Sequence, residues 1–176
     1  MPLLAKKKGS PAMASGVPGD RTCATSKCHA GSDLNSGNAE IFIEGLPESF
    51  IANEIYEISL HLNQKGAKAW GFQATVADDG GNPVGTIISK KGENTQMLDP
   101  VRYQSKTSRQ YITHTQRGTK GPKKGVSPTW TIQWQAPDST GVTPSFYFAF
   151  NAANGNKKKT GDKIYTRMVT VPGKTE

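Results

Sequence analysis

The stretch WGFQATVADDGGNPVGTII, residues 70–88, decides the fold class of this chain. Its first half alternates apolar residues with small or polar ones, which predicts a strand with one apolar face. The apolar positions are Trp70, Phe72, Ala74 and Val76. The cluster DDGGNP at 78–83 has turn composition, so we expect 84–88 to be the return strand of a hairpin. A strand with one apolar face must bury it against another layer, and this stretch therefore indicates a β-sheet protein.

The same alternation recurs along the chain between turn-forming residues, and it predicts about eight strands. The further segments are 40–44, 54–62, 109–115, 129–135, 145–150 and 163–171, with an irregular crossing expected over 90–108. No segment repeats apolar residues at helical spacing over the ~11 residues that a helix prediction requires. We therefore predict an all-β fold, an immunoglobulin-like sandwich of two antiparallel sheets.

The chain divides by composition into two parts. Residues 1–38 are rich in Gly, Ser, Pro, Ala and Lys without periodic apolar residues, so we expect an irregular N-terminal arm. Residues 39–176 carry the predicted strands and form the sandwich domain. Leu, Ile, Val and Phe make up only about 18% of the chain, which predicts a thin core that a bound cofactor or partner would stabilise.

Several classes of function lack their sequence signatures. We find no Gly-rich phosphate loop, no HExxH and no GxSxG, and we expect that the protein is not an enzyme. No run approaches the ~18 apolar residues of a membrane span. The first residues contain too few apolar side chains for the core of a secretion signal, and this absence is uninformative because a mature chain has lost its signal. With the extracytoplasmic location expected below, we expect that the signal peptide has been removed.

The chemistry-bearing segment is CATSKCH, which holds both cysteines, Cys23 and Cys28, directly before His29. Two nearby thiols can form thioethers with the two vinyl groups of a haem, and a following His can ligate the iron. The spacing here is two residues longer than the usual CxxCH. The alternatives are a disulfide that closes a six-residue loop, a metal site, or free thiols.

Five phrases resemble, in order, a family of secreted bacterial Reeler-like domains known as choice-of-anchor V domains. They are GDRTCATSKCHAG at 19–31, WGFQATVADDGGNPVGTI at 70–87, YITHT at 111–115, WTIQWQAP at 130–137 and NAANGNKKKTGDKIYT at 151–166. The resemblance implies a β-sandwich that follows a haem-binding N-terminal segment outside the cytoplasm. It implies one covalent haem c held by Cys23, Cys28 and His29.

A second iron ligand has few candidates. His114 shares strand parity with Ile112 and lies in the YITHT phrase, so we predict that His114 is the distal ligand. Met97 in an expected polar loop is the next choice, and His61 is expected on the solvated face of a strand. Met168 alternates with apolar residues and is expected in the core.

The formal net charge is +8, with lysines grouped at 6–8, 90–91, 120–124 and 157–159. These groups either keep the surface solvated or steer an acidic redox partner. No aromatic residues interleave with them, so nucleic acid is not expected as a partner.

Two functional hypotheses follow. The first is a monohaem c-type cytochrome-like protein that transfers electrons, alone or as a subunit of an extracytoplasmic respiratory complex. The second is a non-catalytic structural or adhesion module with a Cys23–Cys28 disulfide, capable of self-assembly. Haem c attachment and stable disulfides both indicate a periplasmic or secreted location.

Overall fold

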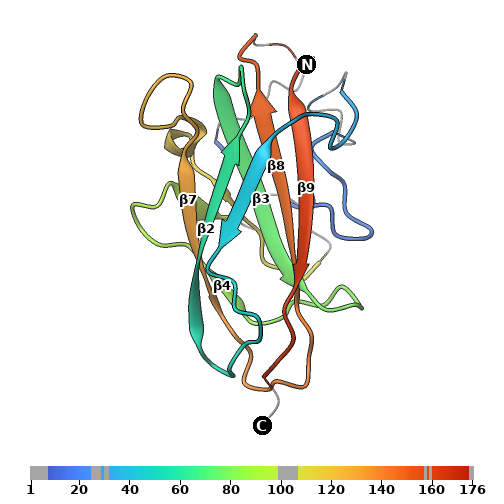
Figure 1. Ribbon diagram of the computed structural model, residues 1–176. Helices are drawn as coiled ribbons and strands as arrows, with labels where there is room; N and C mark the ends of the chain where they lie inside the picture. The colour runs from blue at the N-terminus through green and yellow to red at the C-terminus, as the bar shows by residue number, and fades with distance from the viewer. Residues whose placement is uncertain are drawn as a thin grey trace.

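Two antiparallel β-sheets pack face to face in the computed structural model (Figure 1). The structure describes residues 8–24, 29, 32–98, 107–156, 158 and 160–174. In those residues, no helix is long and apolar enough to cross a membrane. The all-β, two-sheet antiparallel sandwich predicted from residue alternation is therefore confirmed.

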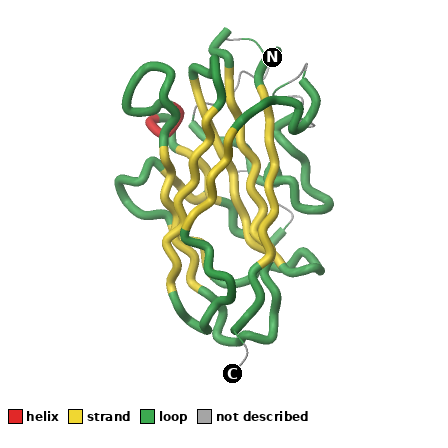
Figure 2. Tube along the Cα trace, in the orientation of Figure 1, coloured by secondary structure: helices red, strands yellow, loops and turns green. Residues whose placement is uncertain are grey.

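The four-stranded sheet has the order β1-β2-β7-β4, and the five-stranded sheet has the order β5-β6-β3-β8-β9. The strands are β1 (Glu40–Glu44), β2 (Ile55–Asn63), β3 (Ala69–Ala77), β4 (Thr86–Ile88), β5 (Thr95–Met97), β6 (Ile112–His114), β7 (Thr129–Gln135), β8 (Ser145–Ala153) and β9 (Lys163–Thr170), with one 3₁₀ turn, η1 (Arg117–Thr119). Loops join them at the two ends of the sandwich (Figure 2).

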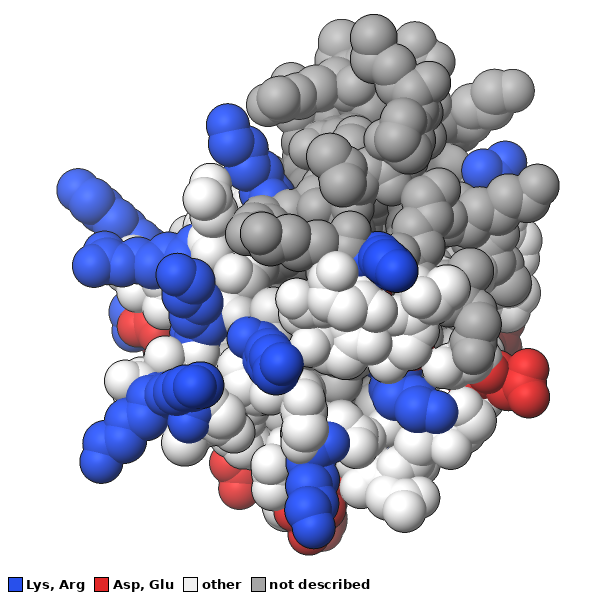
Figure 3. Space-filling model, turned by 90° about the horizontal axis from the view of Figure 1, so that it is seen from above, with Lys and Arg blue, Asp and Glu red and all other residues white. Residues whose placement is uncertain are grey.

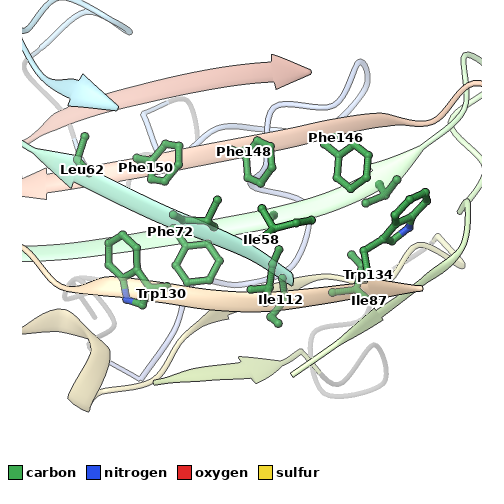
Figure 4. Packing of buried hydrophobic residues seen from close by; sticks show 14 of the residues in the cluster. Ile58, Leu62, Phe72, Ile87, Ile112, Trp130, Trp134, Phe146, Phe148 and Phe150 are labelled. Carbon is green, nitrogen blue, oxygen red and sulfur yellow. The ribbon is translucent and has the colours of Figure 1, made fainter. Parts of the chain in front are cut away.

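The core lies between the sheets and is built mainly by the alternating positions of four long strands, β2, β3, β7 and β8. Phe146, Phe148 and Phe150 extend along β8 and face Trp130 and Trp134 of β7 (Figure 4). All five side chains are at most 1% exposed. Aromatic rings supply large apolar areas, and so a chain with few aliphatic residues still builds a continuous core.

The hairpin predicted for 70–88 is wrong in its second half. β4 pairs with β7 in the opposite sheet and makes no ladder with β3. Gly85 adopts a positive φ of 66°, and a Cβ there would collide with the Trp134 ring and the Gln135 carbonyl. The chain thus bends at Gly85 and crosses to the other sheet, a course that periodicity alone does not encode.

Three smaller expectations also differ from the structure. The stretch 90–108, expected to be irregular, contains β5. Met97 therefore lies in a strand and packs against the core instead of in a polar loop. Met168, expected in the core, is 60% exposed on β9, because only the first half of this strand is covered.

The N-terminal arm covers the outer face of the five-stranded sheet. Gln73 on that face of β3 is fully buried and binds the arm through Ala14 N–H (2.7 Å), Ser10 Oγ (2.6 Å) and the Pro11 carbonyl (2.7 Å). Further along the arm, the carboxylate of Asp20 is completely buried. The described residues of the arm are thus packed against the sheet.

A buried ion pair anchors the end of this arm. The carboxylate of Asp20 accepts hydrogen bonds from Arg109 Nη2 (2.6 Å) and the Tyr111 hydroxyl (2.7 Å). Arg109 also donates to the Gly81 carbonyl (2.7 Å), so the arm, the β3–β4 turn and the segment before β6 are joined. Buried charges need such partners, because an unpaired one costs several kcal/mol.

Candidate functional site

The two ends of the segment CATSKCH, Cys23 and His29, lie side by side. The backbone N–H of His29 donates to the carbonyl of Cys23 at 3.2 Å. Cys28 lies outside the described residues, so its predicted thioether or disulfide stays a prediction. The backbone contact nevertheless places the first predicted attachment residue beside the predicted iron ligand.

His29 is fixed by two side chains of the five-stranded sheet and its β8–β9 loop. Its Nδ1 lies 2.6 Å from Asp162 Oδ2, and its Nε2 lies 3.2 Å from the amide nitrogen of Asn151. The residue is only 9% exposed, and Asp162 is 4% exposed. An amide nitrogen can only donate, so Nε2 accepts from Asn151 Nδ2, and Nδ1 carries the proton that binds the carboxylate.

Asp162 holds this loop as well as the imidazole. Its other oxygen accepts the backbone N–H of Asn154 at 3.0 Å. The same carboxylate therefore closes the β8–β9 connection and orients His29. A short, buried hydrogen bond from an imidazole to a carboxylate is of the stronger, charge-assisted kind.

His114 ends β6, where side chains replace the backbone ladder with β3. The Phe72 N–H donates to its Nδ1 at 3.0 Å, this Nδ1 also lies 3.1 Å from the Phe72 oxygen, and Thr113 Oγ1 donates to the same carbonyl at 2.6 Å. In the described part of the chain, every hydrogen bond of this imidazole is made through Nδ1. His114 is 8% exposed.

Gly71 brings the two histidines to one place on the sheet. A Cβ at this position would lie 2.6 Å from Cε1 of His114, so the imidazole occupies the space of the missing side chain. Across the β3–β8 ladder, the partner of Gly71 is Asn151, which contacts His29. The two imidazoles therefore flank one pair of ladder residues.

The electrostatics agree with this proximity. Burial lowers the pKa of His114, the hydrogen bond with the Phe72 peptide opposes that effect, and charge on His29 lowers the pKa further. Both effects of the surroundings, burial and a like charge, disfavour the protonated ring. His114 is accordingly neutral at pH 7.

Asn151 leaves one polar atom without a partner in the described part of the chain. Its Oδ1 is buried and makes no hydrogen bond there, while its amide nitrogen contacts His29 Nε2. Buried polar atoms are usually satisfied, and an exception calls for a reason such as an absent ligand. Among the described residues, three or more metal-binding side chains do not gather anywhere.

The other sequence candidates lie apart from this place. His61 is in β2 of the opposite sheet and contacts Ser127 Oγ at 3.1 Å. Met97 packs against the core, two residues along β5 from Thr95, the ladder partner of His114. The structure thus brings together His29 and His114 and leaves His61 and Met97 in other roles.

Sequence reasoning missed Asp162, Asn151 and Gly71. Two of them lie in the phrase NAANGNKKKTGDKIYT and the third in WGFQATV. Both phrases resemble those of a known family, but that resemblance does not single out these three residues. Nothing in a single sequence pairs position 29 with position 162, because the contact depends on how the arm folds over the sheet.

No protein-family model matches the chain, and no curated protein matches it in sequence. Solved structures of F-spondin match its fold. Two fragments of the human F-spondin reeler domain give TM-scores of 0.51 and 0.52 at 13% identity, covering 82% and 81% of this chain and 94% and 95% of theirs. The fold is Reeler-like. The Reelin-N domain of F-spondin agrees, with a TM-score of 0.52 at 12% identity over 82% of this chain and 93% of that one.

Proposed function

We propose that this chain is a monohaem c-type cytochrome domain, in which a Reeler-like sandwich holds an electron-transfer group at one end. The observation that carries the proposal is the meeting of His29 and His114. They come from the CATSKCH loop and from β6, and both are at least nine-tenths buried around the Gly71–Asn151 pair. Two buried imidazoles of this kind would suit as the two protein ligands of a haem iron.

His29 fits the role of proximal ligand through its second hydrogen bond. A metal-binding His usually donates its other ring N–H to a carboxylate or carbonyl, which fixes its tautomer and orientation. Asp162 accepts that proton from Nδ1 and leaves the lone pair on Nε2. The present partner of Nε2 is Asn151, whose Oδ1 lacks a partner in the described residues, and so this amide is free to turn away.

His114 fits the distal role through the Phe72 peptide. Nδ1 accepts the Phe72 N–H at 3.0 Å in one tautomer; in the other it donates to the Phe72 carbonyl, 3.1 Å away, and Nε2 then carries the lone pair that a metal ligand needs. Thr113 can then direct its hydroxyl to Ser10 Oγ, 3.3 Å away. The lowered pKa of His114 keeps the ring neutral, as ligation requires.

Cys23 and Cys28 would hold the porphyrin, and His29 and His114 would hold the iron. A haem c, when bound, supplies one-electron transfer at its iron. The chain's own residues orient the two imidazoles, keep the Nδ1 proton of His29 on the Asp162 hydrogen bond, and exclude water by burial. Two protein ligands would leave no iron position open for a substrate, which agrees with a role in electron transfer. We propose that this role is carried out outside the cytoplasm, alone or as a respiratory subunit.

Intact mass tests the proposal. The full chain is expressed in a bacterial host with a haem c maturation system. In haem attachment, each cysteine S–H adds across one vinyl group, and no atom is lost. We expect the mass to increase by that of one haem, and Cys28→Ala to retain at most one thioether in an alkaline pyridine spectrum. A chain lighter by only two hydrogens, with no haem, would contradict the proposal.

The His114→Ala variant tests the distal ligand. The loaded wild type should have a low-spin spectrum without the Met-to-iron band, and the variant should become high-spin or bind an added ligand. An unchanged low-spin spectrum in the variant would transfer the role to Met97 or His61.

The second candidate function is a structural or adhesion module with a Cys23–Cys28 disulfide. The hydrogen bond from His29 N–H to the Cys23 carbonyl supports it, because a loop with joined ends suits a short disulfide. The mass experiment separates it from the first proposal.

A further inference from the structure

The two ends of the sandwich carry opposite charges. We call the end formed by the β2–β3, β6–β7 and β8–β9 loops the basic end. Its described basic residues are all exposed: Lys65, Lys68, Arg117, Lys120, Lys123, Lys124 and Lys158. The one acidic residue described in these loops is Asp162, which is buried against His29. Figure 3 looks onto this end, where lysine and arginine side chains project in several directions from the described surface.

The opposite end is acidic. Its β1–β2, β3–β4 and β7–β8 loops, residues 45–54, 78–85 and 136–144, contain no lysine or arginine. They carry Glu48, Glu54, Asp78, Asp79 and Asp138. Two described basic residues lie near this end: Lys174, which follows β9, and Arg109, which donates to the Gly81 carbonyl and is paired with Asp20. Charges of opposite sign at the two ends give the molecule a strong electric polarity, which orients it during an encounter.

We propose that the basic end is the docking surface for an acidic protein partner. This inference rests on the proposed function. Asp162 lies in the β8–β9 loop of the same end, and its carboxylate holds the imidazole of His29. A partner seated there would meet the molecule beside the proposed cofactor. Complementary charge chiefly raises the rate of association, which suits the brief encounters of electron-transfer proteins.

The shape of this end suits a protruding acidic segment. An open cavity of about 930 Å³ lies between the β6–β7 loop and the end of β2. Its wall includes Arg117, Lys120 and His61, together with the apolar Pro122 and Val126. Carboxylates entering it would meet two cations, and the exposed Val126 offers a small apolar contact.

The residue types favour a protein over a nucleic acid or a membrane. The three loops contain no Phe, Tyr or Trp, so they offer no platform for stacking bases. Lysine outnumbers arginine six to one among the described basic residues, whereas arginine is the preferred residue for phosphate recognition. Val126 is the one large apolar side chain described as exposed in these loops, too little to insert into a bilayer.

The test uses the full chain and poly-L-glutamate as the probe for an acidic protein surface. Polyglutamate is titrated into the protein at low salt. The NMR shifts of the backbone amides locate the binding surface, and their dependence on polyglutamate concentration gives the affinity. We expect shifts in the three loops of the basic end and none at the acidic end. Short duplex DNA and vesicles containing phosphatidylglycerol are titrated at the same charge concentration, and tighter binding to either would overturn the assignment of a protein partner.

Two variants with matched charge loss localise the surface. Replacing Lys120, Lys123 and Lys124 with Ser should weaken polyglutamate binding about tenfold at low salt. The control replaces Arg21, Arg167 and Lys174 with Ser, since all three are exposed and lie outside the loops of the basic end, and should change binding less than about twofold. Equal losses in the two variants would overturn the proposal.

Self-association gives a further outcome. The acidic end of a second copy is also complementary to the basic end, and so light scattering is measured over a range of protein concentrations. A monomer at all concentrations supports a separate partner. A salt-sensitive increase in molecular mass with concentration that disappears when Lys120, Lys123 and Lys124 are replaced would assign the surface to a second copy. None of these measurements needs haem, so their failure is distinguishable from failure of the mass test.

Discussion

Asp162 uses its two carboxylate oxygens for two purposes, one on the imidazole of His29 and one on the backbone of Asn154. Asp162→Asn keeps an acceptor for one contact but removes the charge from both. We expect the free energy of unfolding to fall by about 2 kcal/mol, because hydrogen bonds to buried charged groups are stronger than neutral ones. Urea unfolding measures the change, with the exposed Asp138→Asn as control. Equal stability of the two variants would contradict the role given to this carboxylate.

Gly71 is needed because the His114 ring occupies the position of its Cβ. In Gly71→Ala, the new methyl group would lie 2.6 Å from Cε1, so the imidazole or the strand must move. We expect destabilisation of about 1–3 kcal/mol, as for other overpacked sites. Gly141→Ala is the matched control, since its nearest neighbour is Ser139 Oγ at 3.5 Å. A Gly71→Ala protein as stable as this control would show that His114 does not pack on β3.

At the scale of elements, the arm depends on one side chain of β3. Gln73 supplies three hydrogen bonds to the arm, and Gln73→Leu would leave the Ala14 N–H and the Pro11 carbonyl without partners. We expect a loss of about 2 kcal/mol in stability. Hydrogen exchange of arm amides should speed up while exchange in β7 and β8 stays slow.

Gln133→Leu on β7 is the control for Gln73→Leu. Gln133 is half-buried, and its described side-chain hydrogen bond goes to Glu57 and not to the arm. Protection of the arm amides should be unchanged in that protein. If the arm stays protected in Gln73→Leu as well, its other contacts, among them those of Asp20 and His29, are enough to hold it.

Strands were predictable from the sequence where one face is buried. β1 and β7 have the predicted bounds, and β2 differs by one residue at each end. Alternation of apolar residues reports burial of a face, but it says nothing about which strand lies alongside. That is why β4 was expected beside β3 and instead pairs with β7, and why the three-residue β5 was missed.

At the scale of the whole molecule, the candidate site could be predicted only in part. The strand position of His114 is readable from parity, and the CATSKCH segment singles out His29 as a candidate ligand. Their meeting is not, because it requires the arm to cross the five-stranded sheet and Gly71 to leave room. The separation of basic and acidic residues between the two ends could not be predicted either, because it depends on which loops lie at which end of the sandwich.

Stability in alkali tests the buried network that anchors the arm to the sandwich. Burial raises the pKa of Tyr111 well above its ordinary value, the hydrogen bond to Asp20 raises it further, and Arg109 opposes the shift. Burial also raises the pKa of Tyr165. In the unfolded chain these phenols ionise near pH ~10, whereas the folded chain retains their protons.

The sign of the pH dependence follows from these protons. Above pH ~10 the unfolded state binds fewer protons than the folded state, so the free energy of unfolding is greatest below that pH and falls as pH rises. Urea unfolding at several pH values between about 8 and 11 measures the slope. Tyr111→Phe should be less stable at pH 8, because Asp20 loses a hydrogen-bond donor, yet should lose less further stability in alkali. A variant with the full wild-type slope would mean that Tyr111 ionises in the folded protein as easily as in the unfolded chain, and that the Asp20–Arg109 cluster is open to water.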